Sequence, residues 1–297
     1  MSSDGKISAM GYPDTQTALQ RADELEADVV SAWPRAWRDL DLVRLEDSGH
    51  WPKWCLLPIA RGAARVVAQP AADFDGRNAP PPPVGAVAAY YSWRFARTVY
   101  TLEPRLVDQL WTSARADLPT LDRFMNLPEW CVHVTGLREH LGADAAYAHL
   151  EYNFRSDRPE LRLLIDFGQG GLERLLPVTV RLDEVSLASA LADYGEVASA
   201  VGTVSPSFER TMSGLLSVID FIASPDARLT NGDQSGRRPE RTGRPIRPRT
   251  TWYVSEAGSV PPVSAGYVPP APSVSAPNSD AAPAAGWRLF RGRKQAR

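Results

Sequence analysis

Hydrophobic and polar positions alternate along the middle of the chain with a period of two. Four successive segments carry this pattern: residues 130–135, 149–154, 161–167 and 176–182. Successive strand residues point to opposite faces of a sheet, so the alternation predicts four strands with one buried face and one wetter face. Because the connections are short, and residues 168–171 form a glycine-rich turn, we expect the strands to pair as an antiparallel meander.

A helical period precedes the strands. Apolar residues recur every three or four positions over residues 15–45, and Pro34 is expected to split or kink this helix. Residues 80–83 are all proline, which suits the approach to a helix because proline lacks a backbone N–H. A second long helical stretch is therefore predicted over residues 84–102.

Two further helices are predicted behind the strands. One covers residues 186–200, and the other starts at Ser205 and Pro206, residue types that favour helix N-termini. The apolar stripe of the latter helix is broad enough to cover a sheet. Together the elements predict an α+β fold, in which an antiparallel β-meander of about four strands packs against N-terminal and C-terminal helices.

The charge and composition of the chain change near Ser224. Residues 224–297 contain 11 prolines, and 12 Arg plus Lys against 5 Asp plus Glu give them a net charge of +7. The whole chain carries −2, so the residues before this point carry −9. A proline-rich segment with few large apolar residues cannot bury enough surface to offset its ordering entropy. We expect a disordered lead-in over 1–14, one α+β domain over 15–223 and a mostly disordered basic tail over 224–297.

The sequence also indicates in which compartment of the cell the protein is expected. The 297 residues contain no apolar stretch of 18 or more, so no membrane helix is expected. The N-terminus has neither the basic start nor the apolar core of a secretion signal. Two cysteines are too few for a disulfide framework. These features favour a cytoplasmic protein with no membrane partner.

Cys131, His133 and His149 are the strongest candidates for chemistry. If the strands that carry them pair, Cys131 faces His149 across the hairpin and His133 lies on the same face. Such groups can ligate zinc or form a thiolate–imidazole pair, so a zinc- or thiol-dependent hydrolase is one alternative. The sequence has no Cys-x-x-Cys, no His-x-x-x-His and no obvious fourth ligand, and a free cysteine is usually a small buried apolar residue. We predict no metal and no cofactor.

Two acidic signals are weaker. Asp166-Phe167-Gly168 matches the magnesium-binding tripeptide of kinases, but no phosphate loop, strand lysine or His-Arg-Asp loop accompanies it. Glu151 and Asp166 are expected on the wetter face, where acidic residues are usually just solvated. The chain is therefore expected to work by binding another macromolecule and not as an enzyme.

Aromatic and basic residues supply candidate binding groups. The nine tryptophans lie mostly in the acidic part of the chain, and large aromatic residues dominate both protein cores and interface hot spots. The tail arginines form two groups beside aromatic residues, a combination that neutralises phosphates and stacks on bases. An RNA-binding accessory protein acting through this tail is a second alternative, and a merely solubilising tail fits the same pattern. The candidate nucleic-acid-binding residues are Arg244, Arg247, Arg249, Arg291 and Arg293.

Several segments resemble one known family in the same order and at similar spacing. The hexapeptide Leu127-Pro128-Glu129-Trp130-Cys131-Val132 is similar to a strand entry of the anti-CRISPR protein VA-two family. Upstream, Ser92-Trp93-Arg94 followed by Val99-Tyr100 resembles the family's Trp-Arg…Ile-Tyr helix. Downstream, residues 214–226 resemble its Gly-Leu-Leu…Pro-Asp helix and exit. The family's basic and aromatic C-terminal segment contains histidines, whereas residues 244–253 contain none.

This resemblance implies a function. Members of the family are encoded by mobile genetic elements, and they suppress synthesis of the type V-A CRISPR effector nuclease by recognising its nascent polypeptide and provoking loss of its mRNA. This chain is therefore expected to bind the nascent polypeptide of a type V-A effector through its body, and to act near the ribosome or mRNA through its basic tail. The expected peptide-binding residues are Trp93, Arg94, Tyr100 and Trp130.

Overall fold

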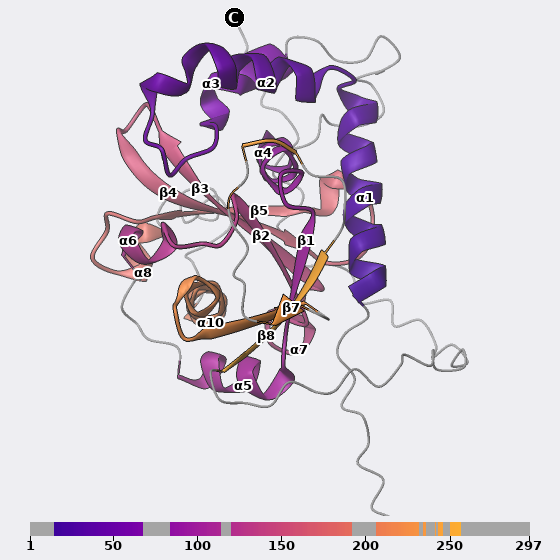
Figure 1. Cartoon of the computed structure of the whole chain (residues 1–297). Helices are drawn as coiled ribbons and strands as arrows, with labels where there is room; N and C mark the ends of the chain where they lie inside the picture. Colours follow the sequence, from indigo (N-terminus) through magenta and orange to yellow (C-terminus); the bar gives the residue numbers. More distant parts are fainter. Residues whose placement is uncertain are drawn as a thin grey trace, which may run out of the picture.

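The computed structural model shows a mixed β-sheet enclosed between two layers of helices (Figure 1). It describes residues 15–67, 84–113, 120–191, 206–231, 234–235, 241, 243–245 and 250–256. Among these residues, no helix combines the length and hydrophobicity that a membrane crossing requires.

Eight strands form the sheet in the described part of the chain. In chain order they are β1 (Thr98–Leu102), β2 (Cys131–Thr135), β3 (Ala145–Asn153), β4 (Arg158–Asp166), β5 (Leu176–Arg181), β6 (Ala227–Asn231), β7 (Gln234–Ser235) and β8 (Thr250–Glu256). Their order across the sheet is β5-β4-β3-β2-β1-β8-β6-β7. β1 runs parallel to both β2 and β8, with Tyr100 between Val134 and Trp252, whereas the other neighbouring strands are antiparallel.

The predicted meander is one part of this larger sheet. The four predicted strands are β2 to β5, and they pair as antiparallel neighbours in chain order. A sheet of about four strands is nevertheless wrong, because β1, β8, β6 and β7 extend it beyond β2 and make it mixed. The α+β class itself is confirmed.

Helices cover the sheet on both sides. In chain order they are α1 (Thr15–Ala32), α2 (Ala36–Asp47), α3 (Ile59–Val67), α4 (Val84–Trp93), α5 (Pro104–Thr112), α6 (Leu121–Phe124), α7 (Arg138–Leu141), α8 (Leu187–Ala190) and α10 (Pro206–Ala223). Short 3-10 helices lie at Ser48–His50 and Leu172–Arg174. The predicted split at Pro34 is confirmed between α1 and α2, and α10 begins at Pro206 as predicted. Of the helix predicted over 186–200, residues 192–200 lie outside the described part.

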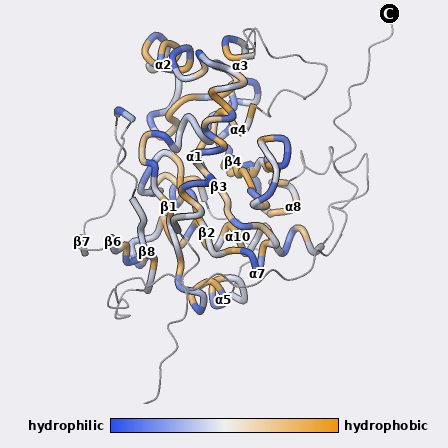
Figure 2. Tube along the Cα trace, turned by 90° about the vertical axis from the view of Figure 1, so that its right-hand side faces the viewer, coloured by the Kyte–Doolittle hydropathy of each residue, from blue (hydrophilic) through white to orange (hydrophobic). Residues whose placement is uncertain are grey.

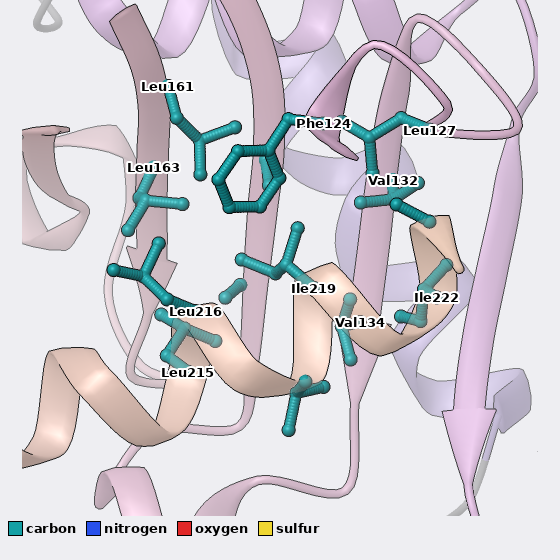
Figure 3. Packing of buried hydrophobic residues seen from close by; sticks show 14 of the residues in the cluster. Phe124, Leu127, Val132, Val134, Leu161, Leu163, Leu215, Leu216, Ile219 and Ile222 are labelled. Atoms are coloured by element: carbon teal, nitrogen blue, oxygen red, sulfur yellow. The ribbon is translucent and has the colours of Figure 1, made fainter. Parts of the chain in front are cut away.

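One face of the sheet packs against α10, with α5, α6 and α8 around it. Figure 2 shows α10, α7 and α5 on one side of the strands and α2, α3 and α4 on the other. The side chains between α10 and the sheet are apolar, and burial of each large one stabilises the fold by roughly 1.5–3 kcal/mol. Figure 3 shows Leu215, Leu216, Ile219 and Ile222 of α10 against Phe124, Leu127, Val132, Val134, Leu161 and Leu163.

The opposite face packs against α1 to α4. Here Tyr90 and Trp93 of α4 meet Cys131, Tyr147 and Leu164 of the strands, and all five are at most 1% exposed. The prediction of one wetter face is therefore wrong for most of the sheet. The prediction assumed that the polar residues of the alternating segments face water. In the structure most of these residues lie beneath helices.

The prediction of one long helix over residues 84–102 is also wrong for the second half of this range. The helix ends at Trp93, and residues Thr98–Leu102 form β1. Arg97 has a positive φ of 50°, which a right-handed helix cannot accommodate. The residues that follow are rich in β-branched side chains, which favour a strand. The Trp93 indole then donates a hydrogen bond to the Thr98 carbonyl at 2.9 Å and ties the helix end to the strand.

The domain does not end at residue 223. Residues Ala227–Asn231 and Thr250–Glu256 are strands of the sheet, and Trp252 is only 6% exposed. The tail predicted over 224–297 therefore contributes part of the folded core up to Glu256. Most of its remaining residues, and the lead-in over 1–14, lie outside the described part of the chain.

Gly214 in α10 provides a test of helix packing. A Cβ atom at this position would lie 2.3 Å from the Trp111 ring of α5. Alanine is the better helix former by about 1 kcal/mol, yet we expect Gly214→Ala to lower the free energy of unfolding by about 1–3 kcal/mol because the clash outweighs that gain. Urea unfolding measures the change. In a protein that carries Trp111→Leu, the added Gly214→Ala substitution should lower the free energy of unfolding by less than it does in the natural protein. Equal losses from Gly214→Ala in the two backgrounds would contradict this packing.

Candidate functional site

The three candidate chemical residues meet on one face of the sheet. Cys131 of β2 is the register partner of His149 in β3, and His133 lies on the same face two residues along. The predicted geometry is therefore correct. All three side chains are at least 95% buried, so their neighbours determine what they can do.

Burial keeps Cys131 and His133 in uncharged forms that suit packing. The pKa of the Cys131 thiol is raised, first by burial and then by the nearby Glu129. Burial alone lowers the pKa of His133 from 6.5 to about 3. The His133 ring stacks on Tyr147 with ring centroids 4.1 Å apart and meets the edge of Trp93. No group of three or more potential ligands among the described residues could hold a metal ion. This geometry does not favour the hydrolase alternative.

The acidic residues of the same face are also held by neighbours. Asp166, which is 1% exposed, pairs with Arg21 of α1 at 3.2 Å and accepts the Gly168 N–H at 2.8 Å. It therefore fixes a turn after β4. Glu151 is 2% exposed and lies 3.6 Å from Arg162. Neither residue is solvated as predicted, and each has an ion-pair partner.

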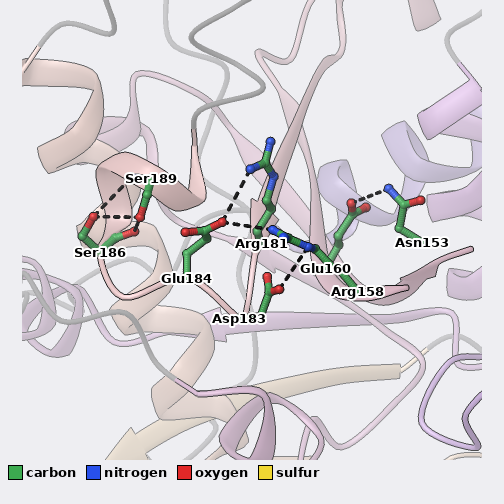
Figure 4. Close-up of polar contacts among 8 residues, drawn as sticks. All are labelled: Asn153, Arg158, Glu160, Arg181, Asp183, Glu184, Ser186 and Ser189. Atoms are coloured by element: carbon green, nitrogen blue, oxygen red, sulfur yellow. Dashed lines mark hydrogen bonds and ion pairs between the residues drawn. The ribbon is translucent and has the colours of Figure 1, made fainter. Parts of the chain in front are cut away.

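A network of ion pairs and hydrogen bonds lies where β4 begins and β5 ends. Arg158 lies 3.3 Å from Asp183 and 3.2 Å from Glu184. Arg181 reaches the same Glu184 at 3.5 Å, and Asn153 donates to Glu160 at 2.7 Å (Figure 4). Each of these arginines has a carboxylate partner.

The family-like hexapeptide connects the two cores. Leu127 and Val132 enter the core beneath α10, whereas Cys131 enters the core beneath α4. Glu129 is 5% exposed and accepts a hydrogen bond from the Thr98 hydroxyl at 2.9 Å, which joins it to β1. Burial raises the pKa of Glu129 to about 7, against the opposing effect of its hydrogen bonds. The hexapeptide thus positions β2 against β1 and leaves Trp130 partly exposed.

The four predicted peptide-binding residues do not form one surface. Trp93 and Tyr100 are fully buried and lie in different cores, on opposite faces of the sheet. Arg94 is half-buried, lies 3.5 Å from Asp41 and covers the Trp37 ring. Trp130 is partly exposed elsewhere, so Trp93 and Tyr100 can support a surface but not present one.

The predicted nucleic-acid-binding residues are mostly outside the described part of the chain. Arg247, Arg249, Arg291 and Arg293 all lie there. Arg244 is described and exposed. Nucleic-acid binding through these arginines stays a prediction.

Partly exposed aromatic rings gather around Trp54, in the turn between α2 and α3. Trp54 meets Tyr152 edge-on at 6.2 Å, and Tyr152 meets Phe154 in the same way at 4.9 Å. The Arg61 guanidinium of α3 lies 4.4 Å above the Phe154 ring. These side chains come from two segments separated by about ninety positions, which the end of β3 brings together.

A third and a fourth segment complete this surface. Arg241 lies 4.9 Å above the Trp130 ring and donates hydrogen bonds to the carbonyls of Leu127 at 3.2 Å and Met125 at 3.0 Å. Trp130 directly precedes Cys131, which pairs with His149 of β3, the strand that carries Tyr152. Trp54, Trp130 and Tyr152 all pack against the same core. We define the aromatic–arginine surface as Trp54, Trp130, Tyr152, Phe154, Arg61 and Arg241.

Of the six residues of this surface, Trp130 alone is among the binding residues predicted from the sequence, and its role stays a prediction. Tyr152 belongs to the alternation that predicts a strand over residues 149–154. Arg241 fell in the predicted disordered tail. The usable signal was the density of aromatic residues at 51–54 and 152–154, but only the fold shows that they adjoin.

The fold and site define an α+β protein with a mixed sheet and a composite aromatic surface. The crystal structure of AcrVA2 has a similar fold, with a TM-score of 0.56 and 17% sequence identity over 81% of this chain and 83% of that chain. The model of the anti-CRISPR type V subtype A2 family matches residues 100–267, more than half of the chain. This chain belongs to that AcrVA2-like family. No curated protein matches it.

His133 gives a test of the buried site. Below pH 6.5 the unfolded chain binds a proton at this residue that the folded protein does not, so stability is present above pH 6.5 and is lost toward pH 3. The loss amounts to about 1.4 kcal/mol for each pH unit at most. Phenylalanine keeps the ring contact without the proton, so His133→Phe should flatten the fall. Urea unfolding between pH 4 and pH 8 measures this, and equal slopes for both proteins would show that His133 is protonated in the fold.

Proposed function

We propose that this chain is an anti-CRISPR protein that represses synthesis of a type V-A CRISPR effector. It recognises a segment of the effector's nascent polypeptide, and this recognition leads to loss of the effector mRNA. Membership of the anti-CRISPR type V subtype A2 family carries the anti-CRISPR part of the proposal.

The aromatic–arginine surface supports recognition of a polypeptide. Trp54, Trp130, Tyr152 and Phe154 all remain partly exposed, although each packs against the core beneath α1 to α4. Tryptophan, tyrosine and arginine are the residue types most enriched at binding hot spots. Because the rings are anchored on a strand end and a packed turn, binding would cost little ordering of the surface.

The polar residues of the sheet support a binding role over a hydrolytic one. Cys131 and His133 are held by burial in protonated and neutral forms, respectively, and both lie under helices. A nucleophile must reach its substrate and form a thiolate, and neither condition is met here.

Co-expression with a type V-A effector tests the proposal. Effector protein and effector mRNA should both fall in cells that produce this chain, compared with cells carrying an empty vector. Trp54→Ala should reduce this repression because it removes the central ring of the aromatic–arginine surface, while thermal melting monitors whether the variant still folds. Unchanged effector protein and mRNA with the natural chain would contradict the proposed function for that effector.

Trp37→Ala is the matched control. Trp37 is also partly exposed and packs against the same core, but it lies beside Tyr91 and Arg94, away from the aromatic–arginine surface. We expect this variant to retain repression. If Trp37→Ala abolishes repression and Trp54→Ala does not, the polypeptide binds around Arg94, the residue predicted from the sequence.

A further inference from the structure

Two cations of the aromatic–arginine surface have no acidic partner within the described part of the chain. Arg61 is exposed and contacts the ring of Phe154. Arg241 is partly buried, and its guanidinium contacts two backbone carbonyls and the Trp130 ring. Burial lowers the pKa of Arg241, the direction expected for a cation that lacks a carboxylate.

Two other arginines over aromatic rings, Arg94 and Arg97, differ in this respect. Arg94 lies over Trp37 and pairs with Asp41, and Arg97 lies over Trp93 and pairs with Glu26 at 2.6 Å. Arg65, one turn after Arg61 in α3, pairs with Glu46 at 2.9 Å. Carboxylates therefore pair with neighbouring arginines, whereas no described carboxylate forms an ion pair with Arg61 or Arg241.

Two described acidic groups near this surface, Asp157 and Glu151, are already engaged. Asp157 accepts a hydrogen bond from the Tyr152 hydroxyl. Glu151, which acts on the Cys55 thiol, is buried and lies 3.6 Å from Arg162. Residues 1–223 carry a net charge of −9, yet among the residues that the structure describes none of these acids pairs with Arg61 or Arg241.

We propose that the aromatic–arginine surface binds an acidic polypeptide segment in which carboxylates alternate with apolar side chains. The carboxylates pair with Arg61 and Arg241, and the apolar side chains pack on Trp54 and Tyr152. This inference rests on the proposed function and specifies the chemistry of the segment that is recognised. Arginine pairs a carboxylate through two parallel hydrogen bonds, which gives both attraction and orientation.

A peptide fits this surface better than RNA does. Arg61 and Arg241 each cover a ring, so the covered faces of Phe154 and Trp130 are not open to a stacked base. Single-stranded nucleic acid also requires a groove of cations that follows the phosphates. A net acidic domain repels such a polyanion, whereas a short segment with a few carboxylates needs only local pairing.

Peptide binding to the full chain tests the inference. One fluorescein-labelled peptide alternates leucine with aspartate, and its isosteric control carries asparagine in place of each aspartate. Fluorescence anisotropy should show tighter binding of the aspartate peptide, and this preference should weaken at high salt. Arg61→Gln should weaken binding of the aspartate peptide about fivefold, the effect of one partly solvated ion pair, and leave the asparagine peptide unchanged.

Arg65→Gln is the control on the same helix, because Glu46 already neutralises this charge. It should leave binding of both peptides unchanged. Equal affinity for the two peptides, equal effects of Arg61→Gln and Arg65→Gln, or tighter binding of a labelled oligouridine than of the aspartate peptide would each overturn the inference. If the natural chain represses the effector but shows no preference for the aspartate peptide, the inference fails and the proposed function stands. If it prefers the aspartate peptide but does not repress the effector, the proposed function fails and the binding preference stands.

Discussion

Burial of the sheet on both faces is the constraint on which the rest of this structure depends. A polar strand residue that lies beneath a helix must find a partner or remain uncharged, because an unpaired charge in the interior is costly. Asp166 pairs with Arg21, and His133 stays neutral against Tyr147. Residues that resemble catalytic groups in the sequence are thus used to build the interior. The proposed binding function therefore falls to side chains that are exposed where the sheet ends.

The position of β8 between β1 and β6 determines which side chains are exposed at the end of the sheet. This strand comes from residues 250–256 yet lies between β1 and β6, so the C-terminal part of the chain supplies an interior strand of the sheet. Arg241 precedes it and contacts the Met125 and Leu127 carbonyls and Trp130. Four segments distant in sequence meet in this way. The aromatic–arginine surface is therefore a product of the tertiary fold.

The sequence predicts those elements whose signal is local. β2 to β5 alternate over several residues each, and Pro34 and Pro206 mark helix boundaries, so these features are confirmed. β1 is a buried five-residue run that continues the apolar positions of α4, and no periodicity separates the two. β8 lies in a proline- and arginine-rich context that predicts disorder. The pairing of Cys131 with His149 was predicted, but their depth beneath helices was not, because long-range packing decides it.

A protein that recognises a nascent polypeptide must distinguish the encoded amino acids from the message that encodes them. The most direct test of the account uses two effector genes, one with a changed mRNA sequence and one with a changed polypeptide sequence. One gene is recoded synonymously, so that the polypeptide is kept and the mRNA changed, and the other carries compensating frameshifts around the recognised segment, so that the mRNA is nearly kept and the polypeptide changed. The account predicts that this chain represses the recoded effector and spares the frameshifted one. Repression of the frameshifted effector, with escape of the recoded one, would contradict it.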